Sequence, residues 1–402
     1  MASASPTIPR RVAGMLLPPF DTLKLKAAKL RADGHDVISL GQAVPGFGPP
    51  DAAVEAARLA LSRPETHLYS ADAGLLTLRA ALCAAFRTHH QIEAVADEII
   101  ITAGGNQAFM LAAMTLLDPG DEVILPSPYF VNHEMTLRAI GAVPVEAPLD
   151  DALGFQTRWA DIEPRITSRT RAIVLCTPAN PTGAVIGETE LTRIVHEAAA
   201  RGLVLISDET YRHFMREDRH AAPETPGSGA PSAASASIRS DNVVVVGTFS
   251  KSFGMTGWRV GYMLAAAEVC EQALKIQDAM IICAPVISQI AAEAAVRESW
   301  NHAHAFDAEL QARRAILADG IARIPQLHWT QTSGAFFAFV GVSGCTDSAA
   351  LAAEILERAH VVTIPGAAFG RAGEGYLRLS YGAASREQLT EACERLRVFF
   401  AG

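Results

Sequence analysis

The sequence lacks the features that mark several large classes of protein. It has no C-x-x-C pair, and its six cysteines lie far apart, so neither a zinc site nor a disulfide framework is indicated. No apolar run is long enough to span a membrane. No basic block or DNA-binding motif is visible, and the net charge of −9 disfavours a nucleic-acid partner. No internal repeat stands out. We therefore expect a globular protein without a metal site, a membrane segment or a nucleic-acid partner.

The amino terminus carries one weak targeting signal. Arg10-Arg11 resembles a twin-arginine signal, but Pro18-Pro19 interrupts the apolar run that should follow. We therefore expect a cytoplasmic protein whose first 20 residues form an arm. The 402 residues, of which 50% are apolar, suffice for two domains with cores of their own.

Apolar runs alternate with helical patterns between about residues 98 and 265. This alternation predicts a mostly parallel sheet that is covered by helices on both faces. The active sites of such sheets lie beyond the carboxyl ends of the strands. Four residues fall at or just past predicted strand ends: Gly105, Asn180, Asp208 and Lys251. We therefore expect them to meet at one edge of the sheet.

The most specific stretch is TFSKSFGMTGWRVGY, from Thr248 to Tyr262. Lys251 lies there in a turn of small and hydroxyl residues, which suits close approach to a ligand. A partly desolvated lysine near another cation loses its proton more easily, and a neutral amine forms a Schiff base with an aldehyde. Arg259 offers a planar fork for a phosphate. An aldehyde and a phosphate on one small molecule describe pyridoxal 5′-phosphate.

This stretch resembles the cofactor-lysine segment of the class I/II aminotransferases, which are pyridoxal-phosphate enzymes of fold type I. The resemblance covers nearly the whole chain. It implies an α/β fold with a mostly parallel seven-stranded sheet sandwiched by helices, plus a smaller α+β domain. The implied domains are residues 1–48 (arm and part of the small domain), 49–290 (large cofactor-binding domain) and 291–402 (small C-terminal domain). A cytoplasmic homodimer that acts in amino acid metabolism is implied as well.

The resemblance also assigns residues to the cofactor. An aspartate at the end of a buried strand is costly unless it is paired, and Asp208 would pair with the protonated pyridine nitrogen. Asn180 and Tyr211 would reach the ring hydroxyl. The implied cofactor-binding residues are Gly105, Asn106, Phe130, Asn180, Asp208, Tyr211, Thr248, Ser250, Lys251 and Arg259, with Tyr69 contributed by the other subunit. The implied catalytic residues are Lys251, Asp208 and Tyr211.

Two of these assignments have further support or an alternative, and the resemblance points to one further residue beside Asp208. The Gly104-Gly105 pair opens a helix after a strand, so backbone N–H groups and the helix dipole can bind an anion there. Phe130 would stack on the pyridine ring, with Tyr129 as the competing choice. His133 matches a histidine that supports the carboxylate at the ring nitrogen.

Substrate recognition is implied for Arg378, Ala43 and Asn180. Arg378 would clamp the α-carboxylate of the substrate with two hydrogen bonds. Residues 43–47 read Ala-Val-Pro-Gly-Phe where the family commonly has Gly-x-Pro-Asp-Phe, so an acidic residue is missing and alanine replaces glycine.

The amino donor is predicted from two further observations. Asn106 stands where bacterial aspartate enzymes often carry a lysine, and residues 15–17 of the arm are apolar. We therefore expect an L-amino acid with a neutral, apolar or aromatic side chain.

Two alternatives stay open at this point. A lyase or synthase that uses the same cofactor, for β-elimination or decarboxylation, would keep the same lysine, aspartate and arginine. A ligand-sensing regulator is less favoured, because the chain retains the whole catalytic set. Residues 221–240, rich in Ala, Ser, Pro and Gly, are expected to form a mobile surface loop.

Overall fold

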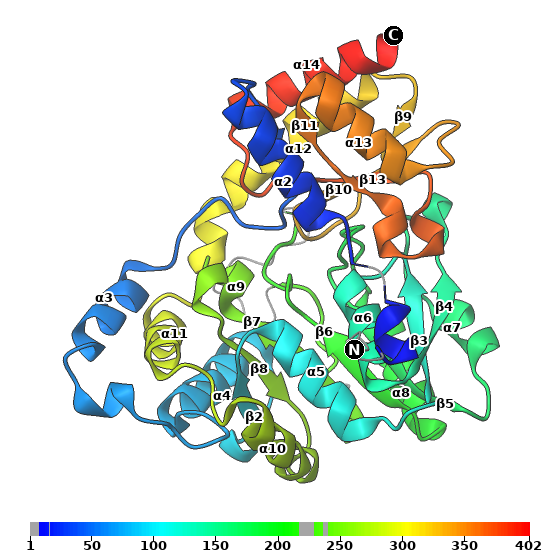
Figure 1. Cartoon of the computed structure of the whole chain (residues 1–402). Coiled ribbons are helices and arrows are strands. Elements are labelled where there is room, and N and C mark those ends of the chain that lie inside the picture. The colour runs from blue at the N-terminus through cyan, green and yellow to red at the C-terminus, as the bar shows by residue number, and fades with distance from the viewer. Residues whose placement is uncertain (1–7, 16, 217–228, 236–239) are drawn as a thin grey trace, which may run out of the picture.

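The large sheet of the protein has seven strands. It lies in the lower part of Figure 1, which draws the computed structural model. The structure describes residues 8–15, 17–216, 229–235 and 240–402. The strand order is β2-β8-β7-β6-β5-β3-β4. The strands are β2 (Ile99–Thr102), β3 (Glu122–Ser127), β4 (Val143–Pro148), β5 (Thr170–Cys176), β6 (Val204–Asp208), β7 (Val243–Thr248) and β8 (Gly261–Leu264). The direction of β8 is opposite to that of the other six strands, so the sheet is mostly parallel, as predicted.

Both faces of this sheet are buried, because successive side chains of each strand enter different cores. Along β7, Val243 and Val245 pack in one core, and Val244 and Val246 pack in the other. The first core is covered by α4 (Leu76–His90), α8 (Glu188–Ala200) and α11 (Val286–Glu298). The second is covered by α5 (Gly105–Leu116), α6 (Val131–Ile140) and α10 (Ala267–Ile281). Two-sided burial explains why these strands read as unbroken apolar runs.

A second group of elements packs above the sheet and combines both ends of the chain (Figure 1). Its strands are β1 (Ile38–Ser39), β9 (Leu327–His328), β10 (Phe337–Val342), β11 (Val361–Val362), β12 (Ile364–Pro365) and β13 (Tyr376–Ser380). Strands β12-β13-β10-β9 form an antiparallel sheet, and β1 pairs with β11. Its helices are α2 (Phe20–Ala32), α12 (Asp307–Ala322), α13 (Ser348–Ala359) and α14 (Arg386–Ala401). The predicted fold class is confirmed, whereas the boundaries at residues 48 and 290 stay predictions.

The remaining helices are short or peripheral: α1 (Arg10–Ala13), α3 (Asp51–Ala60), α7 (Trp159–Ile162) and α9 (Phe249–Ser252). Helix α1 lies within the predicted arm and packs against α6, where Arg11 Nε donates a hydrogen bond to the carbonyl of Ala139 at 3.1 Å. In the described residues, none of these or the other helices has both the length and the apolarity needed to cross a membrane.

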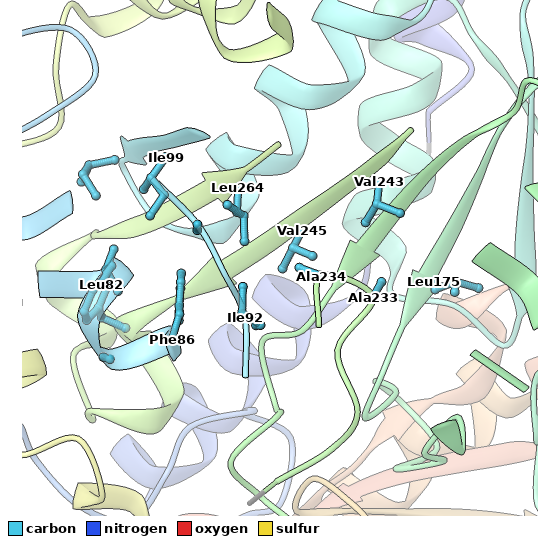
Figure 2. Close-up of a cluster of buried hydrophobic side chains, with 14 of the residues drawn as sticks. Leu82, Phe86, Ile92, Ile99, Leu175, Ala233, Ala234, Val243, Val245 and Leu264 are labelled. Atoms are coloured by element: carbon cyan, nitrogen blue, oxygen red, sulfur yellow. The ribbon is translucent and has the colours of Figure 1, made fainter. Parts of the chain in front are cut away.

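The prediction of a mobile surface loop over residues 221–240 is wrong for residues 229–235. Residues 221–228 and 236–239 lie outside the described part, but residues 229–235 are largely buried. Ala233 and Ala234 pack against the sheet beside Val243 and Val245 (Figure 2). The backbone N–H of Ala233 donates to the carboxylate of Glu209 at 3.0 Å. Small side chains, which suggested a mobile surface loop, let this segment fit closely onto a sheet face.

A cluster of three histidines, two of them buried and one half-buried, lies beside the same core. It comprises His89, His90 and His213, whose rings lie 5.3–5.5 Å from that of Trp300. Neither ring nitrogen of His90 has a hydrogen-bond partner among the described residues. Burial, together with the charge of Arg212, holds the pKa of His90 well below its usual range. Burial, the nearby His304 and Arg212 lower the pKa of His213 to about 3. Both side chains are therefore neutral in the folded protein at neutral pH.

This cluster predicts a loss of stability in acid. In the unfolded chain both histidines recover ordinary pKa values near 6.5, so between about pH 6.5 and 3 the unfolded state binds more protons than the folded state. The free energy of unfolding should therefore fall as the pH drops below about 6.5. The substitution His213→Phe should reduce the shift in urea midpoint between pH 7 and pH 5, whereas His67→Gln, at an exposed position, should not. An unchanged shift in His213→Phe would contradict this account.

Candidate active site

A cavity of about 600 Å³ opens at the carboxyl ends of the parallel strands, between the large sheet and the elements above it. The predicted site residues that line it are Ala43, Gly105, Asn106, Phe130, Asn180, Asp208, Tyr211, Thr248, Ser250, Lys251, Arg259 and Arg378. Strand β8 is antiparallel, so the residue two before its start, Arg259, reaches the same edge as the ends of its neighbours. Topology thus gathers residues that are far apart in the sequence.

Lys251 is held by the first turn after β7. Thr248 caps the one-turn helix α9, accepting a hydrogen bond from the backbone N–H of Ser250 at 3.2 Å. The amine of Lys251 donates to the carbonyl of Ala43 at 2.5 Å. Burial and the positive charges of Arg378 and Arg259 lower the pKa of Lys251 to about 8, although Asp208 opposes the shift. A substantial fraction of this amine is therefore neutral near physiological pH.

Asp208 ends β6 and is 6% exposed. Its Oδ2 lies 3.0 Å from Nε2 of His133, and its Oδ1 accepts a hydrogen bond from the backbone N–H of Thr210 at 3.0 Å. Burial alone would raise the pKa of Asp208, but His133 and Thr210 outweigh burial and leave it below the ordinary value. The cavity therefore contains a buried carboxylate that is held ionised.

The start of α5 forms a compact turn beside Arg259. Gly104, the residue before the helix, has φ of +87°, and a Cβ there would lie 2.5 Å from a guanidinium nitrogen of Arg259. Arg259 donates to the carbonyl of Thr256 at 2.9 Å, which helps to fix its position. Thr248 Oγ1 and Ser250 Oγ, 3.0 Å apart, lie on the same cavity wall. Backbone N–H groups, hydroxyls and a guanidinium together suit a phosphate.

Arg378 on β13 supplies a second cation from the upper layer and is 3% exposed. Its guanidinium donates to Oδ1 of Asn180 at 2.8 Å and to the carbonyl of Gly41 at 2.6 Å. Its Nε is buried without a partner among the described residues. Burial lowers the pKa of Arg378 to about 10, so it stays charged at neutral pH. The orphaned donor marks a place for an anion that the chain itself does not supply.

Of the aromatic residues considered for the site, Phe130 and Tyr211 line the cavity and Tyr129 does not. Phe130 lines the cavity, whereas its competitor Tyr129 packs against the core below and donates its backbone N–H to Phe369. Tyr211 lines the cavity and is 4% exposed, and burial raises the pKa of its hydroxyl. Its ring packs edge-on against Phe336 and Phe337.

Tyr69 is the one predicted site residue that does not line the cavity; it is 77% exposed. Because its expected role involves a second subunit, that role stays a prediction. The arm residues used to predict the donor also lie elsewhere: Met15 and Leu17 are not in the cavity wall, and Leu16 falls outside the described residues.

Sequence reasoning missed one wall of the cavity. Helix α2 contributes Phe20, Lys24, Ala27 and Arg31, at positions i, i+4, i+7 and i+11, which share one helix face. The spacing of these residues is visible in the sequence, but the sequence does not show which part of the molecule this helix face contacts. Phe109 and Cys176 were also missed. Among the described residues, no group of three His, Cys, Asp or Glu side chains is arranged to hold a metal ion.

Comparison with known proteins gives one consistent result along the chain. The family described as aminotransferase class I and II matches residues 35–396. The probable aspartate/prephenate aminotransferase of Aquifex aeolicus is 35% identical over 394 residues, which cover 96% of this chain and 97% of that protein. The crystal structure of the aromatic aminotransferase of Pyrococcus horikoshii OT3 is 33% identical with a TM-score of 0.85, covering 93% of this chain and 98% of that one.

A second solved structure extends the match. The aspartate aminotransferase of Thermus thermophilus with maleate is 32% identical with a TM-score of 0.88, covering 98% of this chain and all (100%) of that one. The agreement of the family match, of full-length relatives and of solved folds leads to one conclusion. The chain belongs to the class I and II aminotransferases, enzymes of fold type I.

Proposed function

We propose that this aminotransferase works with pyridoxal phosphate held at Lys251, and that it moves the amino group of an L-amino acid to a 2-oxo acid. The donor we propose has a neutral, apolar or aromatic side chain. The observation that supports this most is that an amine with a lowered pKa, an ionised buried carboxylate and a buried guanidinium line one cavity, namely Lys251, Asp208 and Arg378.

The cavity residues fit this cofactor. The α5 turn has no room for a side chain at Gly104, so its N–H groups and Arg259 can close on a phosphate. Asp208 uses its hydrogen bonds to stay ionised, as a partner for a protonated ring nitrogen requires. Asn180 and Tyr211 offer polar groups to the ring hydroxyl from the same wall.

When bound, pyridoxal phosphate supplies an aldehyde that condenses with amines and a ring that withdraws electrons from the substrate's Cα. The Lys251 amine moves a proton to and from that Cα, and a pKa of about 8 suits this work near neutral pH. Asp208 offers its negative charge to the ring nitrogen. Arg378 holds the α-carboxylate through its unpartnered Nε and its forked guanidinium, and Asn180 fixes the direction of that fork.

The donor is inferred from the uncharged part of the cavity wall. Phe20, Val44 and Phe130 line the cavity, and the residue after Gly105 is the uncharged Asn106. Relatives named for aspartate/prephenate and for aromatic substrates both occur, so their names alone do not select a donor. An apolar wall gains stabilisation from an apolar side chain in rough proportion to the area that it buries.

The experiment that tests the proposal is the visible absorption spectrum of the purified protein with single L-amino acids. A yellow band should bleach with phenylalanine, leucine or methionine more readily than with aspartate, and it should return with a 2-oxo acid. Preference for aspartate would refute the proposed donor. Release of ammonia without an oxo acid would favour the lyase, and no band after addition of pyridoxal phosphate would refute the cofactor.

We also propose a cytoplasmic homodimer. An exposed apolar group on one flank supports the dimer: Leu61, Leu68, Leu76 and Tyr69 are 61–77% exposed. Large apolar side chains that are exposed this close together in the sequence are candidates for a protein interface. In a dimer with this flank at the interface, Tyr69 would be covered by the second subunit, which agrees with the role expected from the sequence.

The pKa of Lys251 predicts how cofactor capture depends on pH. Only the neutral amine attacks an aldehyde, so below pH 8 the capture rate of the cofactor-free protein should rise about tenfold per pH unit and level off above it. Stopped-flow absorbance after mixing with pyridoxal phosphate measures this rate. The substitution Arg378→Met removes a neighbouring positive charge and should move the midpoint upward. A midpoint near 10.5 in the unmodified protein would contradict the inferred environment.

A further inference from the structure

Helix α2 gives the cavity a wall whose charges the reaction described above does not use. Phe20, Lys24, Ala27 and Arg31 form one face of this helix and line the cavity. The ring of Phe20 lies 5.8 Å from the guanidinium carbon of Arg378, so the helix begins beside the proposed α-carboxylate site. Side chains four residues apart on a helix are neighbours. Lys24 is thus one turn away from the position where the substrate's α-carboxylate would bind.

Lys24 differs from the other cations of the cavity in having no partner. Among the described residues it forms no ion pair or hydrogen bond, and its side chain is exposed to the cavity and the solvent. The other cavity cations each donate to an oxygen of the chain: Arg31 to Val37, Lys251 to Ala43, Arg259 to Thr256, and Arg378 to Asn180 and Gly41. Lys24 is therefore the cation that is available to a ligand.

We propose that Lys24 determines specificity by binding the distal carboxylate of a dicarboxylic 2-oxo acid, the acceptor of the amino group. This inference rests on the function proposed above and names its second substrate. With the α-carboxylate on Arg378, the carbon chain of the acceptor passes the apolar ring of Phe20 and brings its second carboxylate to the next turn of α2. An uncharged donor uses the same apolar surface and leaves Lys24 hydrated.

Two neighbouring charges act on this position. Asp21 also lines the cavity and opposes a carboxylate, whereas Arg31 favours one from two turns further along. Two cations against one anion leave this wall positive. The substitution Asp21→Asn should therefore strengthen binding of a dicarboxylate, an effect of the opposite sign to that of removing Lys24.

The test compares Lys24→Met with Lys29→Met, a lysine on the same helix that is exposed and does not line the cavity. The aminated holoenzyme is mixed with 2-oxoglutarate or with 2-oxohexanoate, a monocarboxylate of similar length that has no distal carboxylate. Lys24→Met should lower kcat/KM for 2-oxoglutarate by about tenfold or more, the size expected for a lost charged hydrogen bond, and leave 2-oxohexanoate within about twofold. Lys24→Arg should restore most of the loss, and Lys29→Met should change neither.

A binding measurement gives an independent readout. Calorimetric titration with glutarate, which cannot react, should show affinity about tenfold weaker in Lys24→Met and stronger in Asp21→Asn, while hexanoate binds equally well to all forms. Equal losses for both acids, no loss at all, or no use of 2-oxoglutarate by the unmodified enzyme would overturn the role of Lys24. If 2-oxohexanoate still accepts the amino group, the proposed function stands. Failure of every oxo acid would instead refute that function together with this inference.

Discussion

Replacement of Lys251 by alanine is expected to abolish transamination, with a fall in kcat of at least about 10⁴-fold. Lys251 would act twice, as the amine that holds the cofactor and as the group that moves the proton at Cα, and proton transfer by a positioned side chain alone contributes about 10²–10⁴-fold. Single-turnover bleaching of the absorption band by a donor amino acid measures the loss.

Two controls separate chemistry from folding. Lys275→Ala, an exposed lysine on α10, should keep full activity. Lys251→Ala should unfold at a similar temperature to the unmodified protein, because it removes a largely buried amine whose charge is costly to bury. Added methylamine should restore part of the proton transfer. Turnover above about 1% of the original rate in Lys251→Ala, without added amine, would show that another group moves the proton.

Replacement of Asp208 by asparagine should lower kcat by about 10²–10³-fold, the range seen when one preorganised electrostatic partner is removed from an active site. Asparagine keeps the shape of the side chain and can still accept the hydrogen bond from Thr210, but it has no charge to hold a proton on the ring nitrogen. The loss should therefore appear mainly in kcat, with a smaller change in the dissociation constant of the cofactor.

His133 provides a graded comparison. Its Nε2 lies 3.0 Å from Asp208, so His133→Gln weakens the support of the carboxylate without removing the carboxylate itself. Its effect on kcat should be clearly smaller than that of Asp208→Asn. Similar losses in the two variants would mean that the pair acts as a unit, and near-normal kcat in Asp208→Asn would exclude the proposed role of its charge.

The residues at the strand ends were predictable from two features of the sequence, the apolar runs of the buried strands and the alternation that indicates a parallel sheet. Burial on both faces makes each central strand a continuous apolar run, so the residue after the run is visible in the sequence. Asp208 ends such a run, Lys251 lies three residues past the end of β7, and parallel topology then places both at one edge. Arg378 was found through the family resemblance, since a strand arginine alone does not reveal what it faces.

The parts that could not be predicted depend on packing between distant segments. Residues 20–31 show a helical stripe, but only the folded chain places that stripe against the cavity. Residues 229–235 have small side chains that predict a mobile surface loop, but small side chains also let this segment lie against the sheet. Tyr69 is exposed in the single chain. Its expected contact is with the cofactor of a second subunit, which one chain does not include.

The division of the cavity between two layers has a consequence for how this enzyme can diverge. Lys251 and Asp208 extend from the large sheet, while Lys24 and Phe20 belong to a helix that packs with the carboxyl-terminal elements. Lys24 is exposed, so its replacement disturbs little of either core. Under the proposed role of Lys24, mutation at this position would exchange one acceptor for another without disturbing the reaction centre. Under this proposal, related enzymes would change their substrate by substitutions in α2 while they keep the residues at the strand ends.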